Sequence, residues 1–367
     1  MTIQAERSGV TTTDGIHLNV ESTGPADAPV TVLLVHGWTC STRAWHHQVE
    51  GLPRILGANA VRVVTYDHRG HGQSDAAPPG SLRIEQLADD LVTVLDEVVG
   101  DGPVVYAGHS MGGMTLMELA DKRPDLFGSR IKAAALVSTS SGQAARGAFG
   151  IPVCFEPAAV RIAPRVAQVV GTRVDRRAER LSAAAAAAAD NAVVAAEGVA
   201  SAVADAAGRA ATTAAGAVEG VALKAGGAAG RVVGGREMAR AARANVAALM
   251  QRPALRQVVF GKKVDPAEIA IFQEGLALLP GATYSGFFEA ILEHDRVHAL
   301  KVLDQIPVEV MHGTRDRLLP PRHANRIAAE LPSARVWMYP GAGHMLPQER
   351  PRDVTHRLAS LARKIAS

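Results

Sequence analysis

A serine between two glycines is the residue of this sequence best placed to act as a nucleophile. Residues 104–114 read VVYAGHSMGGM, so a short apolar run leads into a Gly-His-Ser-Met-Gly turn around Ser110. Glycines let the backbone bend sharply and approach neighbouring segments closely. Gly108, His109 and Gly112 are therefore predicted to form an elbow between a strand and a helix, with the Ser110 hydroxyl turned outward.

A serine hydroxyl becomes a good nucleophile when a neighbouring base takes its proton, and an imidazole held by a carboxylate suits that task. The C-terminal part of the chain offers a candidate for each role. Asp316 lies in HGTRDRLLP and His344 lies in PGAGHMLPQERP. The order serine, aspartate, histidine along the chain is typical of one of several unrelated triad architectures. We therefore expect Ser110, Asp316 and His344 to form a catalytic triad.

The segments around these residues are predicted to alternate between strands and helices. Apolar, β-branched runs predict strands at residues 10–12, 17–21, 31–35, 61–66, 103–107, 131–137, 308–311 and 336–339. Helical spacing predicts helices at residues 42–50, 84–99, 111–122, 322–330 and 348–366. This alternation is typical of an α/β fold, a mostly parallel sheet with helices on both faces. Functional residues of such sheets lie at the carboxyl ends of the strands.

The middle of the chain has a different character. Residues 181–235 are rich in Ala and Gly, and residues 156–263 contain 16 Lys and Arg against 8 Asp and Glu. Between residues 190 and 224 the polar residues gather on one half of a helical projection and valines on the other. This pattern favours small-residue helices in a cap over the active site. The alternative is a basic amphipathic segment that contacts a membrane or lipid surface.

Five segments together resemble the landmark motifs of the α/β-hydrolase superfamily. They read VHGW, DHRGHGQSD, GHSMGG, HGTRDRLLP and PGAGHMLPQERP. The resemblance covers about residues 8–142 and 297–367. It implies an α/β-hydrolase catalytic core at residues 1–142 and 297–367. Residues 143–296 would then be a helical cap inserted after the sixth strand.

The resemblance also implies a role for each candidate residue. Ser110 corresponds to the nucleophile, His344 to the base, and Asp316 to the acid that follows the penultimate strand. Some members carry the acid after an earlier strand, but residues 138–141 read STSS and contain no carboxylate.

An oxyanion forms when the serine attacks, and preorganised N–H groups stabilise it. By the same resemblance, the backbone N–H groups of Trp38 and Met111 correspond to these donors. The chemistry implied is that of a cofactor-free serine hydrolase, a carboxylesterase or lipase-like enzyme acting on a small-molecule ester or lipid. Two alternatives stay open, a C–C bond hydrolase with the same triad and a non-catalytic binding member.

Composition limits the classes of partner and the cellular compartment that we expect for this protein. The formal net charge of +3 and the lack of a Lys/Arg-rich run argue against a nucleic-acid partner. Cys40 and Cys154 form no disulfide framework and no metal-ligand spacing. His294 and His298 have the i, i+4 spacing of a metal site, but their charged neighbours indicate an ordinary solvated helix, so no metal is expected. With no apolar leader or spanning run, a cytoplasmic protein is predicted.

Overall fold

The computed structural model describes residues 6–144, 168, 172, 175, 176 and 253–366, and every structural statement below concerns these residues. Cys154, the Ala/Gly-rich segment at 181–235 and most of the predicted cap at 143–296 lie outside the described residues.

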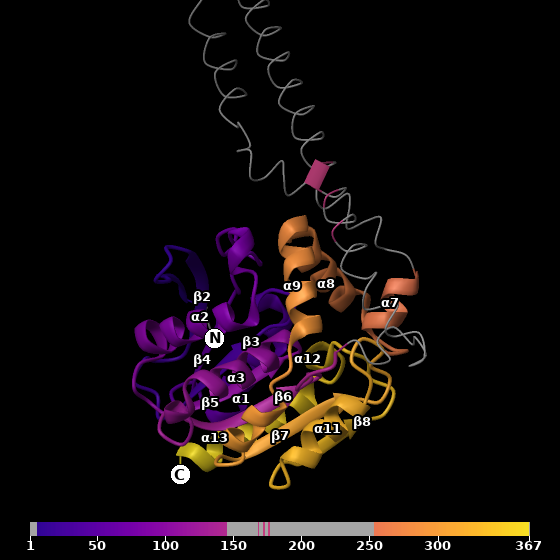
Figure 1. The fold of residues 1–367 in the computed structure, drawn as a ribbon. Helices are drawn as coiled ribbons and strands as arrows, with labels where there is room; N and C mark the ends of the chain where they lie inside the picture. The colour runs from indigo at the N-terminus through magenta and orange to yellow at the C-terminus, as the bar shows by residue number, and fades with distance from the viewer. Residues whose placement is uncertain (1–5, 145–167, 169–171, 173–174, 177–252, 367) are drawn as a thin grey trace, which may run out of the picture.

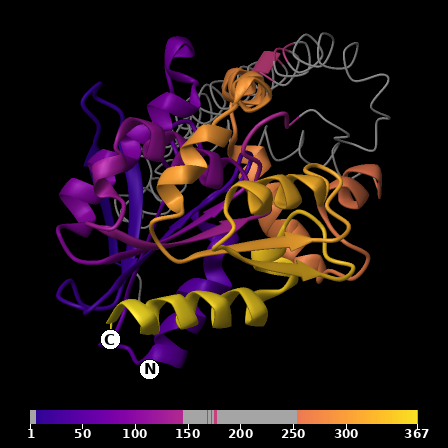
Figure 2. The same cartoon turned by 60° about the horizontal axis from the view of Figure 1, so that its bottom comes forward.

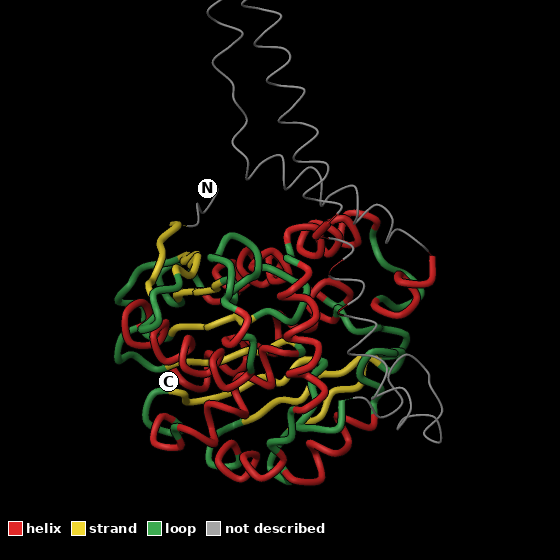
Figure 3. Tube along the Cα trace, turned by 45° about the horizontal axis from the view of Figure 1, so that its top comes forward, coloured by secondary structure: helices red, strands yellow, loops and turns green. Residues whose placement is uncertain are grey.

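The described strands form one sheet in the centre of the molecule (Figure 3). They are β1 (Glu6–Thr11), β2 (His17–Thr23), β3 (Thr31–Val35), β4 (Arg62–Tyr66), β5 (Val104–His109), β6 (Ile131–Val137), β7 (Val308–Gly313) and β8 (Arg335–Tyr339). Their order in the sheet is β1-β2-β4-β3-β5-β6-β7-β8. The pairs β1–β2 and β2–β4 are antiparallel, whereas every other pair is parallel. The prediction of a mostly parallel sheet is confirmed.

Helices pack on both faces of this sheet (Figures 1 and 2). One face packs against α1 (His46–Leu56) and α13 (Pro351–Ala366). The other face packs against α2 (Ile84–Val94), α3 (Met111–Lys122), α10 (Leu300–Leu303) and α11 (Arg322–Glu330). The remaining described α-helices are α7 (Pro253–Val259), α8 (Pro266–Leu278), α9 (Gly281–Glu293) and α12 (Leu346–Glu349).

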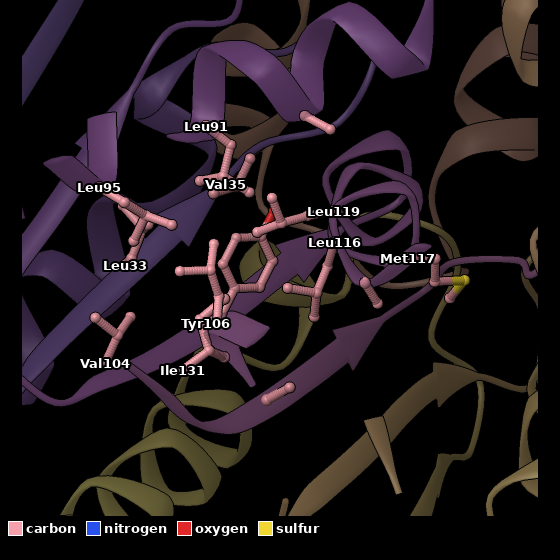
Figure 4. Packing of buried hydrophobic residues seen from close by; sticks show 14 of the residues in the cluster. Leu33, Val35, Leu91, Leu95, Val104, Tyr106, Leu116, Met117, Leu119 and Ile131 are labelled. Carbon is pink, nitrogen blue, oxygen red and sulfur yellow. The ribbon is translucent and has the colours of Figure 1, made fainter. Parts of the chain in front are cut away.

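Successive strand residues point to opposite faces, so each central strand supplies both halves of the core. Leu33 and Val35 of β3 pack in one buried cluster with Tyr106 of β5, as Figure 4 shows. Val32 and Leu34 of the same strand pack in the cluster on the other face. This two-sided burial explains why β3 reads as a continuous apolar run.

The predicted helix at residues 42–50 is a 3-10 turn (Thr42–Trp45) followed by α1, which continues past Pro53 to Leu56. Tertiary packing outweighs the proline, because Leu52 is fully buried in the same cluster as α13 residues. Gly51 permits the close packing of α1 against α13, since a Cβ at this position would lie 2.8 Å from Thr355 Cγ2 of α13.

Two further predicted helices are divided in the structure. The helix predicted at 84–99 is α2 followed by a π-helical turn, Leu95–Val99, which ends at Gly100 with φ of 77°. The helix predicted at 348–366 is the short α12 followed by α13. The break falls at Arg350, because the residue before a proline is disfavoured in the helical conformation.

The prediction of a solvated helix around His294 and His298 is wrong. α9 ends at Glu293, and His294 caps it with only 5% of its surface exposed. His298 lies in a separate 3-10 turn, Val297–Ala299, where its Nε2 is 2.9 Å from Asp121 Oδ1. Burial lowers the pKa of His294 to about 3, so this imidazole is neutral. The spacing of four residues therefore does not place both histidines on one solvated helix.

Within the described part of the chain, no single helix is long and apolar enough to cross a membrane. α8 and α9 meet that criterion only as a pair, and the pair is bent by 104°.

Candidate active site

Ser110 lies at the junction of β5 and α3 in a strained backbone conformation. Its φ is 52° and its ψ is −116°, a combination that residues other than glycine rarely adopt. The Ser110 N–H donates to the carbonyl oxygen of Val137 at 2.9 Å, and Thr139 Oγ1 donates to the Ser110 carbonyl at 2.7 Å. These bonds to the end of β6 hold the bend in place.

The glycines beside Ser110 lie where backbones come closest. A Cβ at Gly108 would lie 2.5 Å from the Gly112 carbonyl oxygen, and a Cβ at Gly112 would lie 2.4 Å from the carbonyl oxygen of Val35. A Cβ at Gly37 would lie 2.9 Å from Ser110 Cβ. The elbow at the end of β5 therefore lies directly against the end of β3, as expected for a turn that needs small residues.

Asp316 and His344 follow β7 and β8, and the fold brings them into contact. His344 Nδ1 is 2.7 Å from Asp316 Oδ2, and both side chains are buried. The backbone N–H groups of Leu318 and Leu319 donate to Asp316 Oδ1 at 3.0 and 2.8 Å. Burial by itself would raise the pKa of Asp316, but the charge and hydrogen bond of His344 outweigh it, so the pKa lies below its usual value.

Ser110 and His344 line one cavity of about 110 Å³. Most of its remaining wall is apolar. α8 and α9 contribute six of the lining residues, Phe272, Leu276, Tyr284, Phe288, Ile291 and Leu292. Trp38 also lines the cavity, and its ring centroid lies 4.6 Å from that of Tyr284. Figure 1 shows α8 and α9 side by side at the edge of the core.

The two residues expected to supply the oxyanion donors, Trp38 and Met111, lie beside Ser110. Met111 is the first residue of α3, where N–H groups have no acceptor within the helix. Trp38 follows Gly37, which contacts Ser110 closely. Trp38 and Met111 thus flank Ser110 from two different segments of the chain.

Contacts that the sequence did not reveal hold the loop of His344. The His344 N–H donates to the Val259 carbonyl at 2.8 Å, and the His344 carbonyl lies 3.0 Å from His109 Nε2. The Glu349 carboxylate accepts from the N–H groups of Gly343 at 3.0 Å and Gly261 at 2.8 Å. The Glu349 carboxylate, five residues after His344, could have been recognised in the sequence as a supporting group. Val259 contributes only backbone atoms, so the sequence carries no signal of its role.

Three histidines beside these residues are buried and serve as hydrogen-bonding groups. Burial lowers the pKa of His36 to about 4 and that of His109 to about 3. His36 Nδ1 lies 2.8 Å from the Gly37 carbonyl oxygen, at the loop that carries Trp38. His312 Nε2 lies 2.7 Å from the Leu319 carbonyl oxygen, and burial lowers its pKa as well. These neutral rings brace the loops that surround Ser110.

Comparisons with known proteins agree with this architecture. Residues 30–160 match the family model of the alpha/beta hydrolase fold. The lipase LipV of Mycobacterium tuberculosis is 41% identical over 110 residues, which cover 30% of this chain and 38% of LipV. The bifunctional esterase/perhydrolase DCH of Acinetobacter calcoaceticus is 38% identical over 104 residues, which cover 28% of this chain and 35% of that protein. The chain thus spans little more than a third of either relative.

A solved structure of similar fold is that of a thermophilic esterase from Thermogutta terrifontis. It matches with a TM-score of 0.61 at 22% identity, covering 99% of this chain and 100% of that chain. The chain therefore has the α/β-hydrolase fold, and about a third of its sequence is similar to part of a lipase and of an esterase.

Proposed function

We propose that this protein is a serine hydrolase that cleaves a carboxylic ester through an acyl-enzyme. The observation that carries the proposal is the meeting of Ser110 and His344 at one apolar cavity, with Asp316 held 2.7 Å from the far nitrogen of the imidazole. An ionised Asp316 keeps the proton on His344 Nδ1. His344 Nε2 is then free to accept a proton from a hydroxyl in the cavity.

In the proposed reaction, Ser110 Oγ attacks the ester carbonyl carbon while His344 Nε2 takes the hydroxyl proton. The N–H groups of Trp38 and Met111 bind the oxyanion, and one such donor contributes on the order of 3 kcal/mol in the transition state. His344 then protonates the departing alcohol, and the acyl group stays bound to Ser110 Oγ. Water attacks that acyl group while His344 Nε2 takes its proton. The bond between the acyl carbon and Ser110 Oγ then breaks, His344 returns the proton to Ser110 Oγ, and the carboxylic acid leaves.

We propose a substrate with a small apolar acyl or alcohol group. The cavity of about 110 Å³ has a mainly apolar wall, and a cavity of about 150 Å³ is known to hold benzene. We further propose that α8 and α9 belong to a cap at residues 143–296 over a core at 1–142 and 297–367. The wall that these two helices contribute supports this division.

The first test is covalent labelling by a fluorophosphonate, which reacts with an activated serine. Wild-type protein should be labelled, and Ser110→Ala should not. Ser129→Ala removes an exposed hydroxyl that does not line the cavity and should label like the wild type. Equal labelling of wild type and Ser110→Ala would exclude Ser110 as the nucleophile. A series of p-nitrophenyl esters of increasing acyl length then measures the substrate preference.

For residues 181–235 we propose a place in the cap, and membrane contact is the alternative. Flotation with phosphatidylglycerol vesicles, comparing the full chain with a deletion of 181–235, separates the two. Negligible flotation of both proteins agrees with the cap. Flotation that is lost on deletion would instead assign the segment to a membrane surface.

A further inference from the structure

A second group of ionisable side chains lies outside the cavity described above. His46 and His47 begin α1 in the core, and Glu268 lies in the first turn of α8. His47 Nε2 is 2.9 Å from Glu268 Oε1, and His46 Nε2 is 3.4 Å from the same oxygen. One ligand atom from each residue lies within 4.8 Å of the others. Two imidazoles and a carboxylate from distant parts of the chain therefore converge on one point.

These separations fit ligand atoms around a small cation as well as hydrogen-bonded atoms. Zinc binds histidine nitrogen and carboxylate oxygen at about 2.0–2.2 Å in a tetrahedron, which places its ligand atoms about 3.3 Å apart. The observed separations of 2.9 and 3.4 Å lie on either side of that value. Imidazole and carboxylate together are also a ligand set that zinc accepts readily.

Hydrogen bonds on the outer side orient two of the three groups. His46 Nδ1 is 3.0 Å from the Arg43 carbonyl oxygen, and only a protonated nitrogen can donate to a carbonyl. In the neutral ring, Nε2 of His46 then presents a lone pair toward Glu268 Oε1. Two lone pairs that face each other repel unless a proton or a metal cation lies between them.

Glu268 is held in the same way. Gln348 Nε2 donates to Glu268 Oε2 at 2.7 Å and to the Glu268 carbonyl oxygen at 3.2 Å, so Oε1 faces the histidines. Bonds of this kind, from the outer atoms of a ligand to a carbonyl or amide, are a regular feature of metal sites. The Glu268 side chain is 9% exposed, whereas those of His46 and His47 are 28% and 36% exposed, which leaves a path from solvent.

We propose that His46, His47 and Glu268 bind one divalent transition-metal cation, Zn²⁺ by the chemistry of the ligands. Three protein ligands leave a fourth tetrahedral position for water. The ion would join the start of α1 to α8, and so tie the core to a helix that lines the cavity. Binding would stabilise the folded chain, because the unfolded chain does not hold the three ligands together.

The direct test is calorimetric titration of ZnCl₂ into tag-free, full-length protein after dialysis against EDTA. We expect one Zn²⁺ per chain. His46→Ala, His47→Ala and Glu268→Gln should each raise the Kd about tenfold or more. His356→Ala removes an exposed imidazole on α13 and should leave the Kd unchanged. No binding to the wild type, or equal binding by all these variants, would overturn the proposal.

A second test needs no variant of the cluster and so does not depend on how well a variant folds. Co²⁺ added to the wild-type protein should give the strong visible absorption of a four-coordinate ion, and Zn²⁺ should displace it. Zn²⁺ should also raise the Tm of the wild type and of His356→Ala. A wild-type protein with no visible Co²⁺ absorption and no change in Tm would contradict the proposed site.

Discussion

At the scale of single residues, Asp316 shows how a few contacts set the ionisation of a buried group. Burial disfavours its charged form, yet two backbone N–H groups at Oδ1 and His344 at Oδ2 keep it ionised. The carboxylate then holds the His344 proton on Nδ1, and Nε2 is left to accept a proton. The proposed chemistry depends on this orientation more than on the acidity of Asp316.

Asp316→Asn should lower kcat for p-nitrophenyl butyrate by on the order of 10⁴-fold, with a small change in KM. The amide has nearly the same shape but no longer holds the proton on His344 Nδ1. Asp304→Asn, an exposed site outside the cavity, should keep wild-type kcat. Steady-state kinetics of the wild type, Asp316→Asn and Asp304→Asn measures kcat and KM. A decrease of less than about tenfold would argue against Asp316 as the orienting acid.

At the scale of elements, the site depends on how closely α3 and β3 approach. The first turn of α3 lies against the end of β3, where Gly112 faces the Val35 carbonyl oxygen. The same approach brings Gly37 against Ser110. The parallel pairing of β3 with β5, in which Val35 lies opposite Gly108, sets this register. A change in packing here would move both Ser110, the proposed nucleophile, and the expected oxyanion donors.

Gly112→Ala should destabilise the protein and lower kcat. The added Cβ would lie 2.4 Å from the Val35 carbonyl oxygen, and overpacking costs about 1–3 kcal/mol. That cost exceeds the gain of up to about 1 kcal/mol from replacing glycine in a helix. Gly102→Ala is the matched control, because a Cβ there meets nothing within 4 Å. Urea unfolding and kcat should distinguish the variants, and equal stability of the two would refute the clash.

At the scale of the whole molecule, buried neutral histidines couple the fold to pH. Burial lowers the pKa of His36 to about 4 and those of His71 and His109 to about 3. In the unfolded chain a histidine titrates near about 6.5. Between about pH 6.5 and about pH 4, these histidines bind protons in the unfolded state but not in the folded state. These histidines therefore contribute stability above about pH 6.5 that is lost progressively on acidification.

The free energy of unfolding should fall as the pH is lowered from about 6.5 to about 4, by up to about 1.4 kcal/mol per pH unit for each histidine. His71→Gln should remove one such contribution and flatten the dependence, whereas the exposed His356→Gln should not. Urea unfolding at pH 7.5, 6.5 and 5.5 measures the slope. If the free energy of unfolding changes equally with pH in His71→Gln and the wild type, His71 does not contribute to the pH dependence.

Much of the fold was predictable because its signals are local. The β-branched run of β3, the glycines around Ser110 and the helical spacing of α3 each depend on neighbouring residues, and the structure has these elements where the sequence predicts them. The order of Ser110, Asp316 and His344 was also readable as motifs. Their roles in catalysis stay a prediction that the labelling and kinetic experiments test.

By itself, the sequence determined the alternation of strands and helices and the motifs at the strand ends, because short-range spacing controls local backbone conformation. Only the tertiary structure decided that α1 continues past Pro53 and that His294 is buried. The same holds for the cavity wall from α8 and α9, and for the approach of His47 to Glu268, 221 residues away. Burial and long-range contacts are properties of pairs of segments, and their energies arise only when the chain brings those segments together.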